Sequence, residues 1–213
     1  MRLEIKLVDS ESQIRQLILN ALKQDVQMTI NKSTHQISDK IKALVKSALM
    51  SEPEYASLMG GQLKAEFGIE SSSSVDAVVE AMVETISITQ NVIKVTNIGL
   101  SGGFTLTMMK SDDMGGVINQ KNAQSLDSKG YALPWLEWLL FRNNEILVRN
   151  YKVKFGQNPY SRSGMAIMIP SDTDWRVPPA FVGSVENNWT TRAIDRVESQ
   201  ILNTIIQTIK DNV

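Results

Sequence analysis

The chain has 213 residues, of which 42% are hydrophobic, with 22 basic and 23 acidic side chains, one histidine and no cysteine. This length suits one large domain or two small ones. A net charge near -1 excludes a general nucleic-acid coat, which needs a surplus of Lys and Arg. The absence of cysteine excludes a disulfide scaffold, a thiol nucleophile and thiolate metal sites, and a single histidine removes most histidine-based catalysis and zinc chemistry.

The sequence predicts no contact with a membrane. Its first eight residues alternate charged and apolar side chains, which is typical of neither a signal peptide nor an anchor. No apolar run approaches the roughly 20 residues that are needed to span a bilayer. We therefore expect a soluble protein that is made in the cytoplasm.

The N-terminal quarter predicts a short strand followed by a very long helix. Leu3, Ile5 and Leu7 alternate with charged residues, which is the period-2 pattern of a strand with one buried face. Asp9 or Ser10 can then cap a helix, and apolar residues recur at helical spacing over about residues 11–50. The helix is either continuous or broken once in its polar middle.

Residues 53–130 predict short helices, a hairpin and a loop. Pro53 opens a short helix over 54–59, and a helix is predicted from Val75 to Met82 after a serine loop at 71–74. The predicted strands are residues 86–95 and the alternating Phe104, Leu106 and Met108, with Gly99-Leu100-Ser101-Gly102-Gly103 as the turn. The polar segment 111–130 predicts a mobile loop.

The last third predicts a short helix, two strands and a long final helix. Residues 133–141 form an apolar helix after Pro134, residues 151–155 a strand with one exposed face, and residues 165–169 a central strand. One apolar stripe then continues to the end of the chain through Trp189, Ala193, Val197, Ile201, Ile205 and Ile209. The predicted fold class is α+β, a single domain over residues 1–213, with the long N-terminal and C-terminal helices packed on a mainly antiparallel sheet.

Candidate chemistry is sparse. The segment Gly99–Gly103 fits G-x-S-x-G, but a nucleophile elbow needs a helix after the serine and a histidine further along the chain. His35, the single histidine, precedes Ser101, so Ser101 has no evident general base, although a serine hydrolase stays the alternative from a different class. The pairs Asp112-Asp113 and Asp172/Asp174 match no calcium-loop spacing. We expect no catalytic residue, no cofactor and no metal.

Two parts of the chain resemble structural proteins of bacteriophages. Residues 41–69, which end in Gly60-Gly61-Gln62-Leu63-Lys64 and Phe67-Gly68-Ile69, resemble a passage of the neck and tail-completion proteins of long-tailed phages. The segments Ser163-Gly164-Met165 and 175–181, before the last helix, resemble that family's entry into its terminal helix. Residues 133–192 as a block resemble virion structural proteins of contractile-tailed phages. The chain is longer than typical members, through residues 70–130.

The resemblance implies a subunit that acts by assembly in the virion. Such proteins form a homo-oligomeric ring, commonly six-fold, between the portal and the tail tube, and the chain would meet neighbouring neck, portal or tail proteins after synthesis in the host cytoplasm. Tail completion or head–tail joining is the preferred role, and a tail terminator or another tail or baseplate protein is the alternative. The near-neutral charge implies at most loose contact with DNA.

Five residues are candidates for the interface between subunits. Trp189 is either a core aromatic, which is the commoner case, or an aromatic that anchors an interface. Leu202 and Ile206 widen the apolar stripe of the last helix beyond what one intramolecular contact needs. Asp112 and Asp113 belong to the predicted loop, which could order on a neighbouring subunit as an arm.

Overall fold

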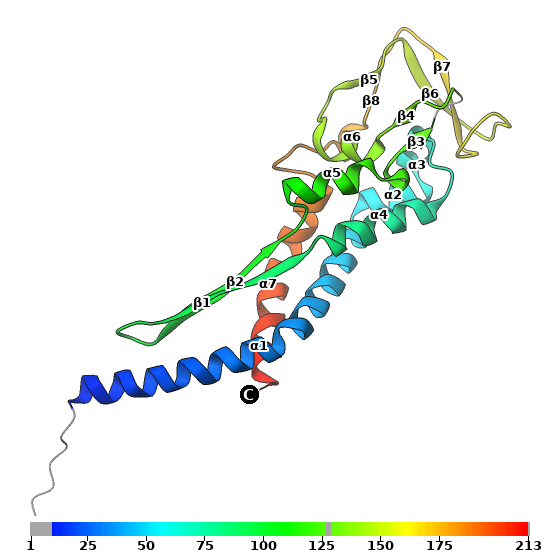
Figure 1. Cartoon of the computed structure of the whole chain (residues 1–213). Coiled ribbons are helices and arrows are strands. Elements are labelled where there is room, and N and C mark those ends of the chain that lie inside the picture. Colours follow the sequence, from blue (N-terminus) through cyan, green and yellow to red (C-terminus); the bar gives the residue numbers. More distant parts are fainter. Residues whose placement is uncertain (1–9, 127–128, 213) are drawn as a thin grey trace, which may run out of the picture.

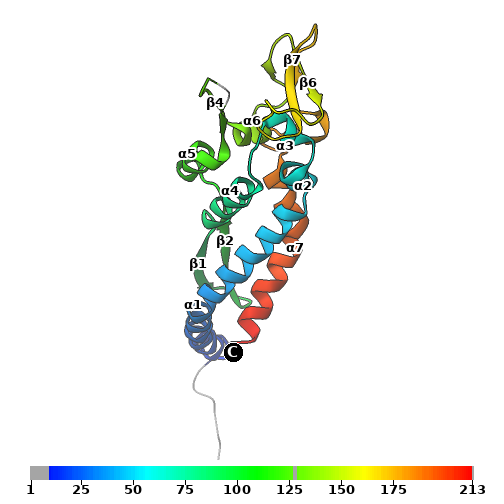
Figure 2. The same cartoon turned by 90° about the vertical axis from the view of Figure 1, so that its right-hand side faces the viewer.

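A computed structural model describes residues 10–126 and 129–212, and the predicted strand at residues 3–7 lies outside them. Its fold is α+β, as predicted. Two long helices, α1 (Glu11–Ser51) and α7 (Trp189–Lys210), form the long axis of an elongated molecule (Figures 1 and 2). The short helices and most of the short strands gather at the end of this axis where α1 stops and α7 starts (Figure 1).

Helix α1 is continuous, and local chemistry sets both of its ends. The Ser10 hydroxyl accepts a hydrogen bond from the Gln13 backbone N–H, and the Gln13 side chain accepts one from the Ser10 backbone, so the pair forms a capping box. The helix stops at Ser51 because Pro53 disfavours the helical conformation for Glu52, which is extended. The prediction of a long helix over residues 11–50 is confirmed.

Helix α7 runs antiparallel to α1 and buries its apolar stripe against it. At one end, the Trp189 indole N–H donates to the Leu49 carbonyl at 2.9 Å. At the other end, the Asn212 side-chain amide donates to the Gln36 side-chain carbonyl at 3.0 Å. Between these ends, Ile37, Ile41 and further α1 side chains at helical spacing are fully buried. The final helix thus packs on α1, and α1 in turn contacts strand β1.

The N-terminal part of α1 extends well past the end of α7. Helix α7 stops level with Gln36, and about 25 residues of α1 precede that point, which corresponds to ~37 Å of helix. Ile30 is the first residue of α1 that is buried. We call residues 11–29 the α1 overhang. It projects from the body in Figure 1.

Three short helices cover the C-terminal half of α1. They are α2 (Pro53–Gly60), α3 (Gln62–Phe67) and α4 (Ser72–Glu84). Their buried side chains include Leu58, Leu63, Phe67, Val75 and Met82, which join the α1 and α7 stripes in one core. The serine loop predicted at residues 71–74 is wrong, because the Ser71 side chain caps α4 and the helix starts at once with Ser72.

A long hairpin follows, formed by β1 (Ser87–Val95) and β2 (Leu100–Thr107). It lies beside α1 on the side of the overhang, and β1 contacts the helix (Figure 1). The turn is Thr96–Gly99 and not Gly99–Gly103 as predicted, because the Thr96 N–H and hydroxyl both donate to the Gly99 carbonyl. Gly102 lies within β2, where a Cβ would approach Ile93 to 3.1 Å, so the glycine permits close packing across the hairpin.

The segment 111–130, predicted as a loop, is mostly ordered secondary structure. It holds helix α5 (Ser111–Asn119), a 3-10 turn (Lys121–Ala123) and strand β3 (Ser125–Leu126), and residues 127–128 are not described. Val117, Ile118 and Ala123 are buried in the core. The prediction of a loop is therefore wrong. The segment is polar on average, but these three apolar side chains anchor it in the core.

Among residues 10–126 and 129–212, the remaining strands form three further two-stranded antiparallel ribbons and not one sheet. Strand β7 (Ala166–Pro170) pairs with β6 (Tyr151–Phe155) alone, so it is not the central strand that its apolar run predicted. Beside these lie helix α6 (Trp135–Phe141), which was predicted, and a 3-10 turn at Pro179–Phe181. The other ribbons are β3 with β4 (Ala132–Leu133), and β5 (Ile146–Val148) with β8 (Trp175–Arg176).

Within residues 10–126 and 129–212, none of the helices combines the length and the apolar character that crossing a bilayer requires.

Candidate functional site

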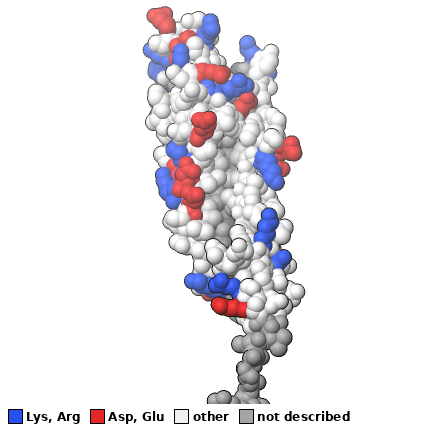
Figure 3. All heavy atoms as spheres, turned by 90° about the vertical axis from the view of Figure 1, so that its left-hand side faces the viewer, with Lys and Arg blue, Asp and Glu red and all other residues white. Residues whose placement is uncertain are grey.

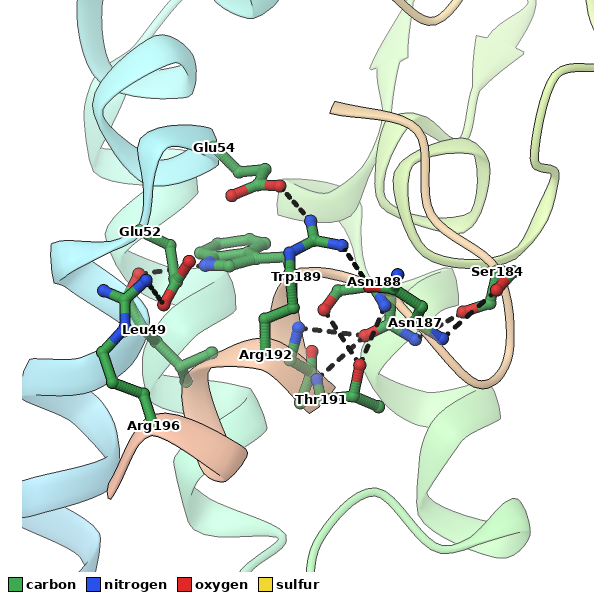
Figure 4. A network of polar contacts seen from close by, with 11 residues as sticks. Leu49, Glu52, Glu54, Ser184, Asn187, Asn188, Trp189, Thr191, Arg192 and Arg196 are labelled. Atoms are coloured by element: carbon green, nitrogen blue, oxygen red, sulfur yellow. Dashed lines mark hydrogen bonds and ion pairs between the residues drawn. The ribbon is translucent and has the colours of Figure 1, made fainter. Parts of the chain in front are cut away.

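Two buried carboxylates lie where α1 meets α2, and both are paired with arginines of α7 (Figure 4). Glu52 is 2% exposed and its Oε1 lies 3.0 Å from a guanidinium nitrogen of Arg196. Glu54 is 1% exposed and accepts a hydrogen bond from the Arg192 guanidinium. Burying a carboxylate without a cation is very costly, so these pairs fix which part of α7 can face the α1–α2 junction.

The start of α7 is held by its own cap and by Trp189. The Asn188 side-chain oxygen accepts hydrogen bonds from the Thr190 and Thr191 backbone N–H groups, and Thr191 completes the capping box. Trp189 is fully buried and donates to Leu49. Its place in the core leaves it no surface for another subunit, which corrects its assignment to the interface.

The four residues of these ion pairs hold α7 in place, and their two carboxylates are not accessible from solvent. Both carboxylates are buried, and neither Glu52 Oε1 nor Glu54 Oε2 has a hydrogen-bond partner among the described residues, so Glu52 Oε1 contacts Arg196 as an ion pair only. We call Glu52, Glu54, Arg192 and Arg196 the α7 clamp. It joins residues that are about 140 positions apart in sequence and holds the start of α7 against the α1–α2 junction.

Ser101 does not lie in a nucleophile elbow. It is the second residue of β2, just after the hairpin turn, and it is followed by strand residues rather than by the helix that the motif requires. His35 is on α1, where its side chain is 91% exposed and lies 3.4 Å from Asp39. Among the described residues no hydrogen bond joins the Ser101 side chain to His35 or to a carboxylate. The motif is therefore part of the hairpin.

The remaining candidate acids lie apart from one another. Asp112 and Asp113 are exposed in the first turn of α5, where negative charge favours the helix N-terminus. Asp174 accepts a hydrogen bond from the Asn150 backbone N–H. In the described part of the chain, His, Asp and Glu form no group of three or more that is placed to hold a metal ion.

An open cavity of about 710 Å³ lies between α3 and the β6–β7 ribbon. Glu66 lies in its wall and accepts hydrogen bonds from the Gln62 amide at 2.7 Å and the Trp175 indole N–H at 3.3 Å. Burial raises the pKa of the Glu66 carboxyl, and these two hydrogen bonds oppose that effect. Tyr160 and Arg162, which also line the cavity, are exposed, so the cavity is shallow on that side.

Exposed apolar side chains gather on the α1 overhang. Leu17, Ile18, Leu22 and Met28 are 65%, 54%, 46% and 55% exposed. At 100° per residue, these four and Ile14 fall within an arc of about 140°, whose centre lies about 150° around the helix from the stripe of Ile30, Ile37 and Ile41. Leu22 is at the edge of this arc, and the exposed Glu11 and Asp25 also lie within it. The overhang therefore has an apolar face that its own core does not cover. Isolated exposed apolar residues are ordinary, but a contiguous stripe of them is typical of an interaction surface.

Few charged side chains lie along the middle of the side of the molecule that contains the α1 overhang. Figure 3 shows the side that contains the hairpin and the α1 overhang, with few Lys, Arg, Asp or Glu side chains along the middle and most of them at the margins and ends. On α7, the predicted interface residues Leu202 and Ile206 are 59% and 42% exposed in the single chain, and their place in an interface stays a prediction. The uncharged middle of this side, which includes polar as well as apolar residues, matches the depletion of charged residues at the centre of protein interfaces.

Sequence reasoning missed both the clamp and the overhang. Glu52 and Glu54 have no local pattern that marks them as buried, and nothing near them in the sequence identifies arginines about 140 residues away as their partners. The apolar residues of the overhang were grouped into one stripe with Ile37 and Ile41. Plotting the angles around the helix would have separated the two faces.

The clamp predicts a large loss of stability when one arginine is removed. Arg192→Ala leaves the buried Glu54 charge without a partner, so we expect the free energy of unfolding to fall by about 3 kcal/mol in urea titrations. Arg142→Ala is the matched control, because Arg142 pairs with Glu137 at the surface and should cost no more than about 1 kcal/mol. Adding Glu54→Gln to Arg192→Ala should restore part of the loss. Equal effects of the two arginine substitutions would show that the clamp does not hold α7.

Glu66 predicts a pH-dependent effect on stability. Because its pKa is higher in the folded chain than in the unfolded chain, stability falls as pH rises through the window between the two values. Glu66→Gln removes the charge and keeps an oxygen that accepts from Trp175. The variant should therefore melt at a higher temperature than the original chain at pH 7. This difference in melting temperature should disappear when the pH falls below the ordinary pKa of a glutamate. A difference in melting temperature that does not change with pH would contradict the raised pKa of Glu66.

Comparisons of the chain with protein-family models, with curated proteins and with solved structures each give no match.

Proposed function

We propose that the chain is a structural subunit of a bacteriophage virion, in the neck or tail, and that it acts by self-assembly into a ring. Tail completion or head–tail joining is the role we favour, with a six-fold ring as the resemblance of residues 41–69 and 133–192 implies. Its partners are further copies of itself and the adjoining neck, portal or tail proteins.

The α1 overhang is the observation that carries this proposal. A helix of this length gains most of its stability from packing, and here about half of it has no buried residue. Its apolar face costs free energy in water unless another chain covers it. A surface that projects from one end of an elongated subunit can reach a neighbouring copy, and repeated contacts of this kind close into a ring when the rotation permits.

The charge distribution supports an assembly role over nucleic-acid binding. The net charge is -1, and the side shown in Figure 3 has no concentrated patch of Lys and Arg. DNA binding requires such a patch because it neutralises phosphates. Contact with DNA in a channel would therefore be loose.

The proposal predicts an oligomer that depends on the overhang. Native mass spectrometry of the full chain should show one closed oligomer, and Leu17→Asp with Ile18→Asp should shift it to monomers because both substitutions place charge on the apolar face. Circular dichroism should show the fold intact, since both side chains are exposed in the single chain. Gln16→Asp with Asn20→Asp adds the same charge to the same part of the helix at exposed polar positions, and should leave the oligomer unchanged.

Particles supply the second readout. Virions purified from the phage that encodes this chain should contain it in a small, fixed copy number, and particles made with the Leu17/Ile18 variant should lack it and lack joined tails. A chain that is monomeric at every concentration and absent from particles would overturn the proposed function.

A further inference from the structure

The cavity between α3 and the β6–β7 ribbon combines a half-buried carboxylate with aromatic walls. Its volume of about 710 Å³ is within the range of ligand sites in proteins, roughly 300–1,000 Å³. Glu66 supplies the carboxylate, and the aromatic side chains in the lining are Tyr131, Tyr151, Tyr160 and Trp175. The cavity is separate from the α7 clamp, and it lies at the end of the molecule opposite to the α1 overhang (Figure 1).

The Glu66 carboxylate is held in position by uncharged donors. Its two oxygens accept one hydrogen bond each, from the Gln62 amide and from the Trp175 indole N–H. The Trp175 ring is itself packed edge-to-face against Phe67, with the ring centroids 5.9 Å apart. An ionised carboxylate has about four acceptor sites, so further donors can still bind. Within the described part of the chain, no Lys, Arg or His forms an ion pair with Glu66.

Among the described residues, Arg162 is the only cation in the lining, and it does not pair with Glu66. Its guanidinium lies against Gly68, where a Cβ would come within 2.8 Å of it. Gly68 ends α3 with a φ of 66°, a left-handed conformation that suits glycine, so the chain leaves room for the guanidinium at this point. Arg162 is exposed there and leaves Glu66 without a cation of its own.

We infer that this cavity binds an arginine side chain of a partner protein, with the guanidinium on Glu66 and against the tyrosine rings of the lining. A guanidinium is planar, stacks on aromatic faces and donates two parallel hydrogen bonds to a carboxylate, so it uses both parts of the lining. Burial raises the pKa of the Glu66 carboxyl, and an arriving cation offsets the cost of ionising that group in the cavity wall.

The open side of the cavity favours a side chain of another protein over a free small molecule. Tyr131 and Tyr160 are exposed in the lining, so a ligand is covered on only part of its surface. Sites for small molecules usually bury roughly 70–90% of the ligand. An arginine on the surface of a partner can place its guanidinium on Glu66 while its main chain stays outside. The inference goes beyond the proposed self-assembly, and neither depends on the other.

A tripeptide with uncharged ends, acetyl-glycyl-arginyl-glycine amide, tests the site. Its matched control is the same tripeptide with citrulline in place of arginine, which keeps the shape and removes the charge. Fluorine NMR of the full chain labelled with fluorotryptophan reports binding through Trp175, whose indole N–H donates to Glu66, and Trp175→Phe assigns the signal. We expect the arginine peptide to shift this signal to saturation, and the citrulline peptide to bind about tenfold or more weakly.

Variants of the lining test the assignment of the carboxylate. Glu66→Gln should weaken binding of the arginine peptide about tenfold or more, and the chain should stay folded because the same substitution is expected to stabilise it at pH 7. Glu70→Gln is the matched control, since Glu70 is exposed and outside the lining, and it should leave the affinity unchanged. Arg162→Gln removes a like charge from the lining and should leave the affinity unchanged or raise it.

Any of four results would overturn the inference. The first is an arginine peptide that does not bind, or binds no better than the citrulline peptide. The second is an equal loss of binding in Glu66→Gln and Glu70→Gln, which would indicate attraction to the surface in general. The third is a loss of binding in Arg162→Gln, and the fourth is binding of free arginine without binding of the tripeptide, which would make the ligand a small molecule. The proposed function would stand in each case, because the oligomer and the α1 overhang test it separately.

Discussion

The antiparallel pairing of α1 with α7 is the constraint on which the rest of the structure depends. At the start of α7, the pairing is fixed by the hydrogen bond from Trp189 to Leu49 and by the two arginines of the α7 clamp, which pair with two buried carboxylates. The paired region ends where α7 ends, level with Gln36 of α1. Since α1 is about twice as long as α7, one pairing both creates the core and leaves the overhang uncovered.

The clamp shows how buried charge contributes to specificity. Replacing ion pairs by well-packed apolar side chains is often neutral for stability, so Glu52 and Glu54 are not needed to make the core stable. A purely apolar α1–α7 stripe could slide by one helical turn, because i and i+4 positions are similar. Two carboxylates that each need their own arginine oppose such a shift. The position of α7, and therefore the length of the overhang, follows from that requirement.

Local signals in the sequence were enough to predict the two long helices. They were not enough to predict which distant segments pair with each other. Ser10, Pro53 and Asn188 mark helix ends by caps that act within four residues, so α1 and α7 could be predicted. Strand pairing is nonlocal: Ile146 pairs with Arg176 across 30 residues, and one predicted sheet became four ribbons. Trp189 shows the same limit, because residue type alone does not separate a core aromatic from an interface aromatic.

The central claim is that the α1 overhang is covered by another copy of the chain. Hydrogen–deuterium exchange on the free subunit and on the assembled oligomer measures this directly, peptide by peptide. Residues 37–49 are buried within one chain and should exchange slowly in both states. Residues 11–29 should exchange fast in the free subunit and become protected in the oligomer. Equal exchange of residues 11–29 in the two states would contradict the account, because the overhang would then remain exposed after assembly.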